Sequence, residues 1–153
     1  MPKEGDTGAK LTSGELTLEF IWRGDRFEHV IQRGEDSLAS ASAPGIETPV
    51  YQEVHQQGEL VFASGMSGDR HWSASVEPIE NGFVFDVACR IKSNVERLGV
   101  AYEGDGPLEA APTDGSELTN PTQGKHLITA PSPSRDLPRT LRCCYRINGG
   151  IIR

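Results

Sequence analysis

Apolar and polar residues alternate with a period of two through most of this chain. The longest such set is Phe83, Phe85, Val87, Cys89 and Ile91. Because successive side chains of a strand point to opposite faces, this pattern indicates strands with one face against a second layer. The pattern predicts strands at residues 15–22, 27–31, 51–55, 60–62, 72–76, 83–91, 98–102 and 141–147.

The sequence favours an all-β fold, because no window has the 3.6-residue period of an amphipathic helix. Residues 93–98 could form one helical turn at most, and scattered glycine and proline would break longer helices. Short strands separated by frequent turns predict an antiparallel β-sandwich of about 7–9 strands. A closed or partly open β-barrel is the alternative, since the hydrophobic pattern alone does not separate the two.

The chain is predicted to form one domain over residues 14–153, preceded by a flexible, polar tail at 1–13. Small polar residues interrupt the strands at 34–49, and a longer interruption covers 103–137. The longer one holds five prolines, four glycines and no Phe, Trp or Tyr. Such a composition buries too little apolar surface to offset the entropy of ordering. We therefore expect a disordered loop at 103–137, with one potential strand at His126–Thr129.

The first hairpin is predicted to turn at residues 24–25, where glycine in the first position suits a two-residue type II′ turn. This turn places Trp22 opposite Phe27 and Phe20 opposite His29. Each apolar residue then meets a partner on the same face, so the pattern and the turn agree.

The second hairpin allows two registers. A two-residue turn at 81–82 would set Glu77 opposite Asp86, about 5 Å apart, near the carboxylate separation of a retaining glycosidase. That register requires a ladder hydrogen bond from Pro78, which has no N–H.

A four-residue loop at 79–82 removes the conflict in the second hairpin. It pairs Val76 with Phe85 and sets Asp86 opposite Ser75, so the carboxylate pair disappears. It also predicts a left-handed conformation for Gly82. We favour this register, and it weakens the argument for an enzyme.

Charge and cysteine content restrict the class of protein. The net charge of −7 argues against a nucleic-acid partner, and no apolar run has the length of a membrane helix. The polar N-terminal sequence lacks a secretory apolar stretch, so we expect a cytoplasmic protein without membrane association. Residues 135–153 carry a net charge of +4 and the remainder −11, which predicts a basic last strand beside acidic ones.

The three cysteines, Cys89, Cys143 and Cys144, form no spaced pattern of a disulfide framework or zinc site. We expect free thiols, with Cys89 and Cys143 pointing inward and Cys144 outward. The sequence predicts no metal and no cofactor, since the phosphate-loop and dinucleotide motifs are missing.

Seven residues are candidates for ligand binding, and none is identified as catalytic: His29, His71, Trp72, Asp86, Arg90, Arg142 and Arg146. His29 could serve in a pocket or as a core histidine with one hydrogen bond. The His71–Trp72 pair could stack a ring-shaped ligand, or Trp72 could be a core aromatic. The other four would form an outward charged cluster if the last strand lies beside 83–91, which ordinary salt bridges also explain.

The lack of a catalytic constellation favours a non-catalytic binding or assembly module, with a protein partner or self-association. The alternative is a small-ligand-binding β domain, or an enzyme, with a pocket near His29, His71 and Trp72. Whether the protein is an enzyme stays open at this point.

Overall fold

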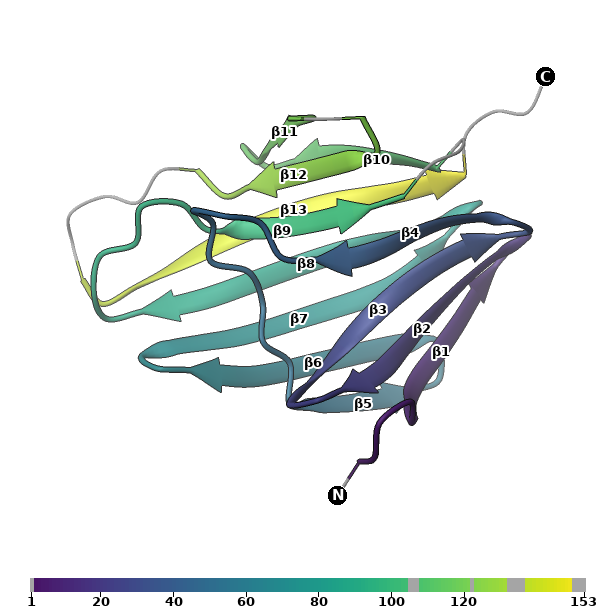
Figure 1. The fold of residues 1–153 in the computed structure, drawn as a ribbon, viewed down its shortest axis with the longest axis horizontal. Coiled ribbons are helices and arrows are strands. Elements are labelled where there is room, and N and C mark those ends of the chain that lie inside the picture. The colour runs from purple at the N-terminus through teal and green to yellow at the C-terminus, as the bar shows by residue number, and fades with distance from the viewer. Residues whose placement is uncertain (1, 105–107, 122, 132–136, 150–153) are drawn as a thin grey trace.

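The computed structural model describes residues 2–104, 108–121, 123–131 and 137–149, and it confirms the predicted antiparallel β-sandwich (Figure 1). These residues form thirteen strands and contain no helix. The strands build two stacked sheets that do not close into a barrel. The described part of the chain therefore also has no helix that could span a membrane.

One sheet has seven strands and the other has six (Figure 1). The seven-stranded sheet has the order β1 (Thr7–Ser13), β2 (Leu16–Arg23), β3 (Arg26–Arg33), β4 (Asp36–Ala41), β9 (Gly99–Glu103), β12 (Lys125–Thr129), β11 (Glu117–Thr119). The six-stranded sheet has the order β10 (Leu108–Thr113), β13 (Arg139–Gly149), β8 (Gly82–Ile91), β7 (Arg70–Ile79), β6 (Leu60–Ser67), β5 (Glu53–Gln57).

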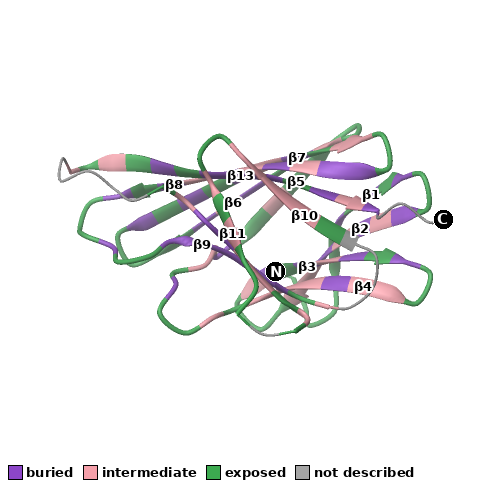
Figure 2. Cartoon of the chain, turned by 90° about the horizontal axis from the view of Figure 1, so that it is seen from above, coloured by how far each residue is buried: buried purple, intermediate pink, exposed green. Residues whose placement is uncertain are grey.

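The core lies between the two sheets, and its residues are those that the alternation places inward (Figure 2). Phe85 is 2% exposed, whereas its neighbour Asp86 is only half-buried. The largest fully buried side chains are Trp72, Tyr102 and Tyr145. Burial of each large apolar side chain contributes about 1.5–3 kcal/mol, so the inward faces supply most of the stability.

Both hairpin registers agree with the sequence prediction. In the first, Trp22 pairs with Phe27 and Phe20 with His29. The glycine that begins the turn, Gly24, has a φ of 70°. A side chain with a Cβ adopts such an angle with difficulty, which explains glycine at this position.

The second hairpin pairs Val76 with Phe85 and Ser75 with Asp86, which is the register favoured from the sequence. The four-residue loop itself is wrong, because Ile79 pairs with Gly82 and the turn between the strands consists of residues 80 and 81. The prediction of a left-handed Gly82 is wrong, because Asn81 has the positive φ, at 55°. Gly82 is needed for space instead, since an added Cβ would lie 2.5 Å from the Ile147 carbonyl oxygen. Glu77 and Asp86 therefore do not lie opposite each other, as the rejected register would require.

Strands occupy three segments for which the sequence predicts a tail or loops. Residues 7–13 form β1, in which Leu11 is 4% exposed, rather than the end of a flexible tail. β4 lies within 34–49, and β10 and β11 lie within 103–137. The same segment holds β12, which confirms the potential strand at His126–Thr129. These strands use single apolar residues such as Leu38 and Ile128, with neighbouring strands completing the core.

The extra strands raise the number above the predicted 7–9. The parts of the predicted loop at 105–107, 122 and 132–136 lie outside the described residues.

The connection between β4 and β5, residues 42–52, crosses from one sheet to the other (Figure 1). Arg70 fastens it at one end of the sandwich, because its guanidinium donates two hydrogen bonds to the Glu47 carboxylate, at 2.9 and 3.0 Å. The same guanidinium donates to Asp69 and to the carbonyls of Ser93 and Asn94. This contact fixes residues 42–52 beside the site described below.

Candidate functional site

The seven-stranded sheet opens between β3 and β4. These strands pair from Arg33 only as far as Val30 with Ala39. Beyond Ala39, β4 diverges from β3 while its other edge stays paired with β9, so the first half of β3 is not paired with β4. Phe27 bonds to the 42–52 connection, donating its backbone N–H to the Tyr51 carbonyl at 2.7 Å. We call this opening the β3–β4 split.

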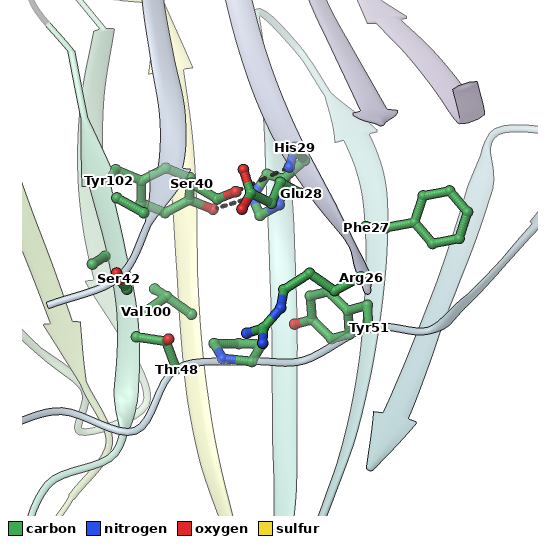
Figure 3. Close-up of a pocket in the computed structure, with 13 residues that line it drawn as sticks. Arg26, Phe27, Glu28, His29, Ser40, Ser42, Thr48, Tyr51, Val100 and Tyr102 are labelled. Atoms are coloured by element: carbon green, nitrogen blue, oxygen red, sulfur yellow. Dashed lines mark hydrogen bonds between the residues drawn. The ribbon is translucent and has the colours of Figure 1, made fainter. Parts of the chain in front are cut away.

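The β3–β4 split contains a cavity of about 370 Å³ (Figure 3). That volume lies within the range of small-molecule sites, roughly 300–1,000 Å³. Its hydroxyl-bearing lining residues are Ser40, Ser42, Thr48, Tyr51 and Tyr102. Outward-facing Arg26 and Glu28 also line it, together with inward-facing His29. The cavity therefore connects the outer surface with polar groups of the core.

His29 lies at the inner wall of the cavity and is 7% exposed. Its backbone N–H donates to the Ser40 hydroxyl at 3.0 Å, which replaces the missing ladder bond to β4. The imidazole stacks on Phe85 and contacts Phe20 at centroid distances of 5.4 and 5.1 Å. Burial lowers the pKa of His29 to about 4, so the ring is neutral at neutral pH.

A chain of hydrogen bonds runs from His29 into the core. His29 Nε2 lies 2.7 Å from the Tyr102 hydroxyl, which lies 2.5 Å from the Tyr145 hydroxyl. Either tyrosine hydroxyl can donate to the other. The tautomer of the neutral imidazole sets whether Nε2 accepts from Tyr102 or donates to it.

The three groups in this chain are poor proton-transfer groups near neutral pH. Burial raises the pKa of Tyr102 and Tyr145, and it lowers that of His29. An effective general acid or base has a pKa near the working pH. The arrangement is therefore suited to hydrogen bonding with a ligand rather than to acid–base chemistry.

Tyr51 places a hydroxyl in the cavity without a protein partner. The residue is 4% exposed, and its hydroxyl oxygen points into the cavity on the side of Arg26 and Thr48 (Figure 3). No described residue hydrogen-bonds to this hydroxyl, and burial raises its pKa, so it stays protonated. An available donor and acceptor in a nearly buried side chain is a feature of ligand sites.

Five of the seven sequence candidates share a different surface, the outer face of the six-stranded sheet. His71 is exposed and pairs with Arg90, and Asp86 forms an ion pair with Arg142. Arg146 also faces outward there. The predicted charged cluster therefore consists of one cross-strand salt bridge, between Asp86 and Arg142, with Arg90 and Arg146 on the same face. This outer face is separated from the cavity by the core.

Trp72 is a core aromatic, 1% exposed, so the structure does not bring His71 and Trp72 to the cavity with His29. The pocket expected near all three residues is formed around His29 alone. The side chain before Trp72 points outward because neighbours on a strand alternate.

All three cysteines are free. Cys89 and Cys143 point inward, as predicted, but the prediction of an outward Cys144 is wrong in part, since that residue is 7% exposed. Its N–H donates to the Ser116 hydroxyl, which shows that the chain after β10 lies over it. Burial raises the pKa of Cys144 to about 11, so it is a thiol rather than a nucleophilic thiolate.

Comparison with known proteins found no match for this chain. No family model, curated protein or solved structure matches it. Within the described residues, no group of three or more His, Cys, Asp or Glu could hold a metal ion.

Sequence reasoning missed Tyr51, Tyr102 and Ser40 as site residues. One signal was available: three predicted apolar faces carry a residue with a polar end, namely His29, Tyr102 and Tyr145. Buried side chains of this kind need hydrogen-bond partners, which suggests a shared location. No sequence pattern points to Ser40 as a site residue, because its contact with His29 depends on where β4 stops pairing with β3.

Proposed function

We propose that this protein is a non-catalytic binding module that holds a small, uncharged polar molecule in the β3–β4 split. The observation that carries the proposal is the Tyr51 hydroxyl, which points into the cavity from a nearly buried side chain and bonds to no described residue. A bound hydroxyl, carbonyl or amide would complete its hydrogen bonding.

The lining favours an uncharged ligand. The inner groups, His29, Tyr51 and Tyr102, are neutral at neutral pH. The one cation of the cavity, Arg26, is bonded to Asp25 at 2.9 Å among the described residues. The carboxylate of Glu28 also lines the cavity but faces outward. A ligand charge held at the inner groups would therefore lack a counterion, and an unpaired buried charge is strongly unfavourable.

A panel of uncharged polar compounds tests the proposed function: glucose, inositol, nicotinamide and uridine. We expect at least one to raise the melting temperature and to shift backbone amide signals of residues 26–29, 40–42 and 48–51. Tyr51→Phe should weaken that binding about fivefold to tenfold, because one hydrogen bond contributes about 1 kcal/mol. The proposal is wrong if no compound shifts these signals, or if Tyr51→Phe binds as tightly as the wild type.

Self-association through the outer face of the six-stranded sheet is a second candidate function. Phe62 and Met66 are 43% and 54% exposed there. They lie beside the small residues Ser73, Ser75 and Ala88. Small side chains make this part of the sheet surface flat, so another sheet can pack on it. We propose a second copy of this chain as the partner. The nearby Asp86–Arg142 pair carries one negative and one positive charge, so it is complementary to the same pair on an identical face.

Light scattering during gel filtration tests this second candidate. A dimer that dissociates in Phe62→Ser, with an unchanged melting temperature, would support it. A monomer up to about 1 mM protein would contradict it, since a dimer with a Kd near that value would be partly formed.

A further inference from the structure

A second hollow of about 370 Å³ adjoins the β3–β4 split on the same sheet. It shares Ala41, Ser42, Ala101 and Tyr102 with the cavity. Ala41 and Ala101 are cross-strand partners, so the two hollows lie on either side of this small pair. The two hollows therefore adjoin each other, and Arg97 lines the second one as well.

The lining of the second hollow differs from that of the cavity. Its floor is largely apolar and comes from Ala43, Pro44, Pro121 and Leu127. Leu127 pairs with Ala101 on the neighbouring strand, which continues the apolar surface away from the cavity. Lys125 and Glu103 lie at this hollow and pair with each other at 3.4 Å. We call this surface the Leu127 hollow.

The two hollows thus offer different chemistry within one continuous region. The cavity presents hydroxyls and a neutral imidazole, whereas the Leu127 hollow presents hydrocarbon. Transfer of hydrocarbon from water to such an apolar surface lowers the free energy. Polar ligand groups bind best where the pocket has hydrogen-bond partners for them.

We propose that the ligand is an uncharged amphiphile, with its polar head in the β3–β4 split and its apolar tail on the Leu127 hollow. This inference rests on the proposed function, which supplies the head-group site, and adds the tail. Joining a head and a tail that bind adjacent hollows should give tighter binding than either part alone, because the second contact becomes intramolecular.

Octyl glucoside, used below its critical micelle concentration, tests the inference with glucose as the head alone and octanol as the tail alone. Affinities are measured by NMR titration on the wild type, Tyr51→Phe, Leu127→Ser and Phe62→Ser. Phe62→Ser is the matched control, because it removes an exposed apolar side chain from the opposite sheet. Melting temperatures establish that each variant is folded.

We expect octyl glucoside to bind at least about tenfold more tightly than glucose or octanol. Leu127→Ser should weaken octyl glucoside several-fold and leave glucose unchanged, Tyr51→Phe should weaken both, and Phe62→Ser should weaken neither.

Equal affinities for glucose and octyl glucoside, with no effect of Leu127→Ser, would overturn the tail site while leaving the proposed function standing. Failure of all three probes to shift signals around the split would overturn the amphiphile proposal, and the proposed function would then stand only if inositol, nicotinamide or uridine shifted those signals. Weakening by Phe62→Ser alone would move amphiphile binding to the other sheet and would also contradict both.

Discussion

His29 is a titratable residue that burial among aromatic rings keeps neutral. Its pKa in the folded protein is about 4, below the value of about 6.5 for an exposed histidine. Between these values the unfolded chain binds a proton that the folded protein does not. Acid therefore favours unfolding over this range.

We predict that the free energy of unfolding is unaffected by His29 above about pH 6.5 and falls by about 3 kcal/mol from there to pH 4. Urea denaturation at several pH values measures the loss. His29→Gln keeps a polar side chain but does not titrate, so its stability should vary less with pH over this interval. An identical pH dependence in the variant would show that His29 is not buried as described.

The tyrosines Tyr102 and Tyr51 should respond differently to the loss of their hydroxyls. Tyr102→Phe leaves His29 Nε2 and the Tyr145 hydroxyl without their partner, so the unfolding free energy should fall by about 1–3 kcal/mol. Tyr51→Phe removes a hydroxyl that has no described protein partner, so stability should change by less than about 0.5 kcal/mol. Equal losses in the two variants, measured by urea denaturation, would contradict the hydrogen-bond chain.

At the scale of elements, Arg70 joins three segments at one end of the sandwich. It bonds to Glu47 in the 42–52 connection and to the carbonyls of Ser93 and Asn94 after β8. Its side chain is 10% exposed, and its removal would lose the hydrogen bonds that a charged group makes to these segments.

We predict that Arg70→Ala lowers the unfolding free energy by about 2–3 kcal/mol. Arg142→Ala is the control, because the Arg142–Asp86 pair is exposed and such pairs contribute about 0–1 kcal/mol. Arg70→Lys should recover little, since a lysine cannot supply the forked donors. Similar melting temperatures for the two alanine variants would show that Arg70 does not fasten these elements.

How far the elements could be predicted depends on which interactions define them. Alternation and turn chemistry are local, so they predict β2, β3, β7, β8 and β13 and both hairpin registers. Proline's missing N–H decided the register at Pro78. The strands β4 and β10 were missed because their stability comes from distant partners, β9 and β13.

The candidate site could be predicted only in part for the same reason. His29 was identified because it interrupts an apolar face. The β3–β4 split arises because β4 diverges from β3 beyond Ala39, while its other edge pairs with a strand about sixty residues away, as Ala41 with Ala101. No local pattern encodes this divergence. Tyr51 enters the site through its backbone bond to Phe27, which is also non-local.

At the scale of the whole molecule, two packed sheets supply stability while one interrupted sheet supplies access to the core. The split needs the rest of the sandwich to be rigid, because a cavity persists only when its walls are fixed by packing elsewhere. The site belongs to the fold as a whole: β3, β4, β9 and the 42–52 connection all line it.

The most direct test of this account is an NMR titration of isotopically labelled protein with octyl glucoside below its critical micelle concentration. The account predicts amide shifts concentrated at residues 26–29, 40–42, 48–51 and 100–102, reduced in Tyr51→Phe. Shifts confined to the strands carrying Phe62 and Met66, or none at all at saturating ligand, would contradict it.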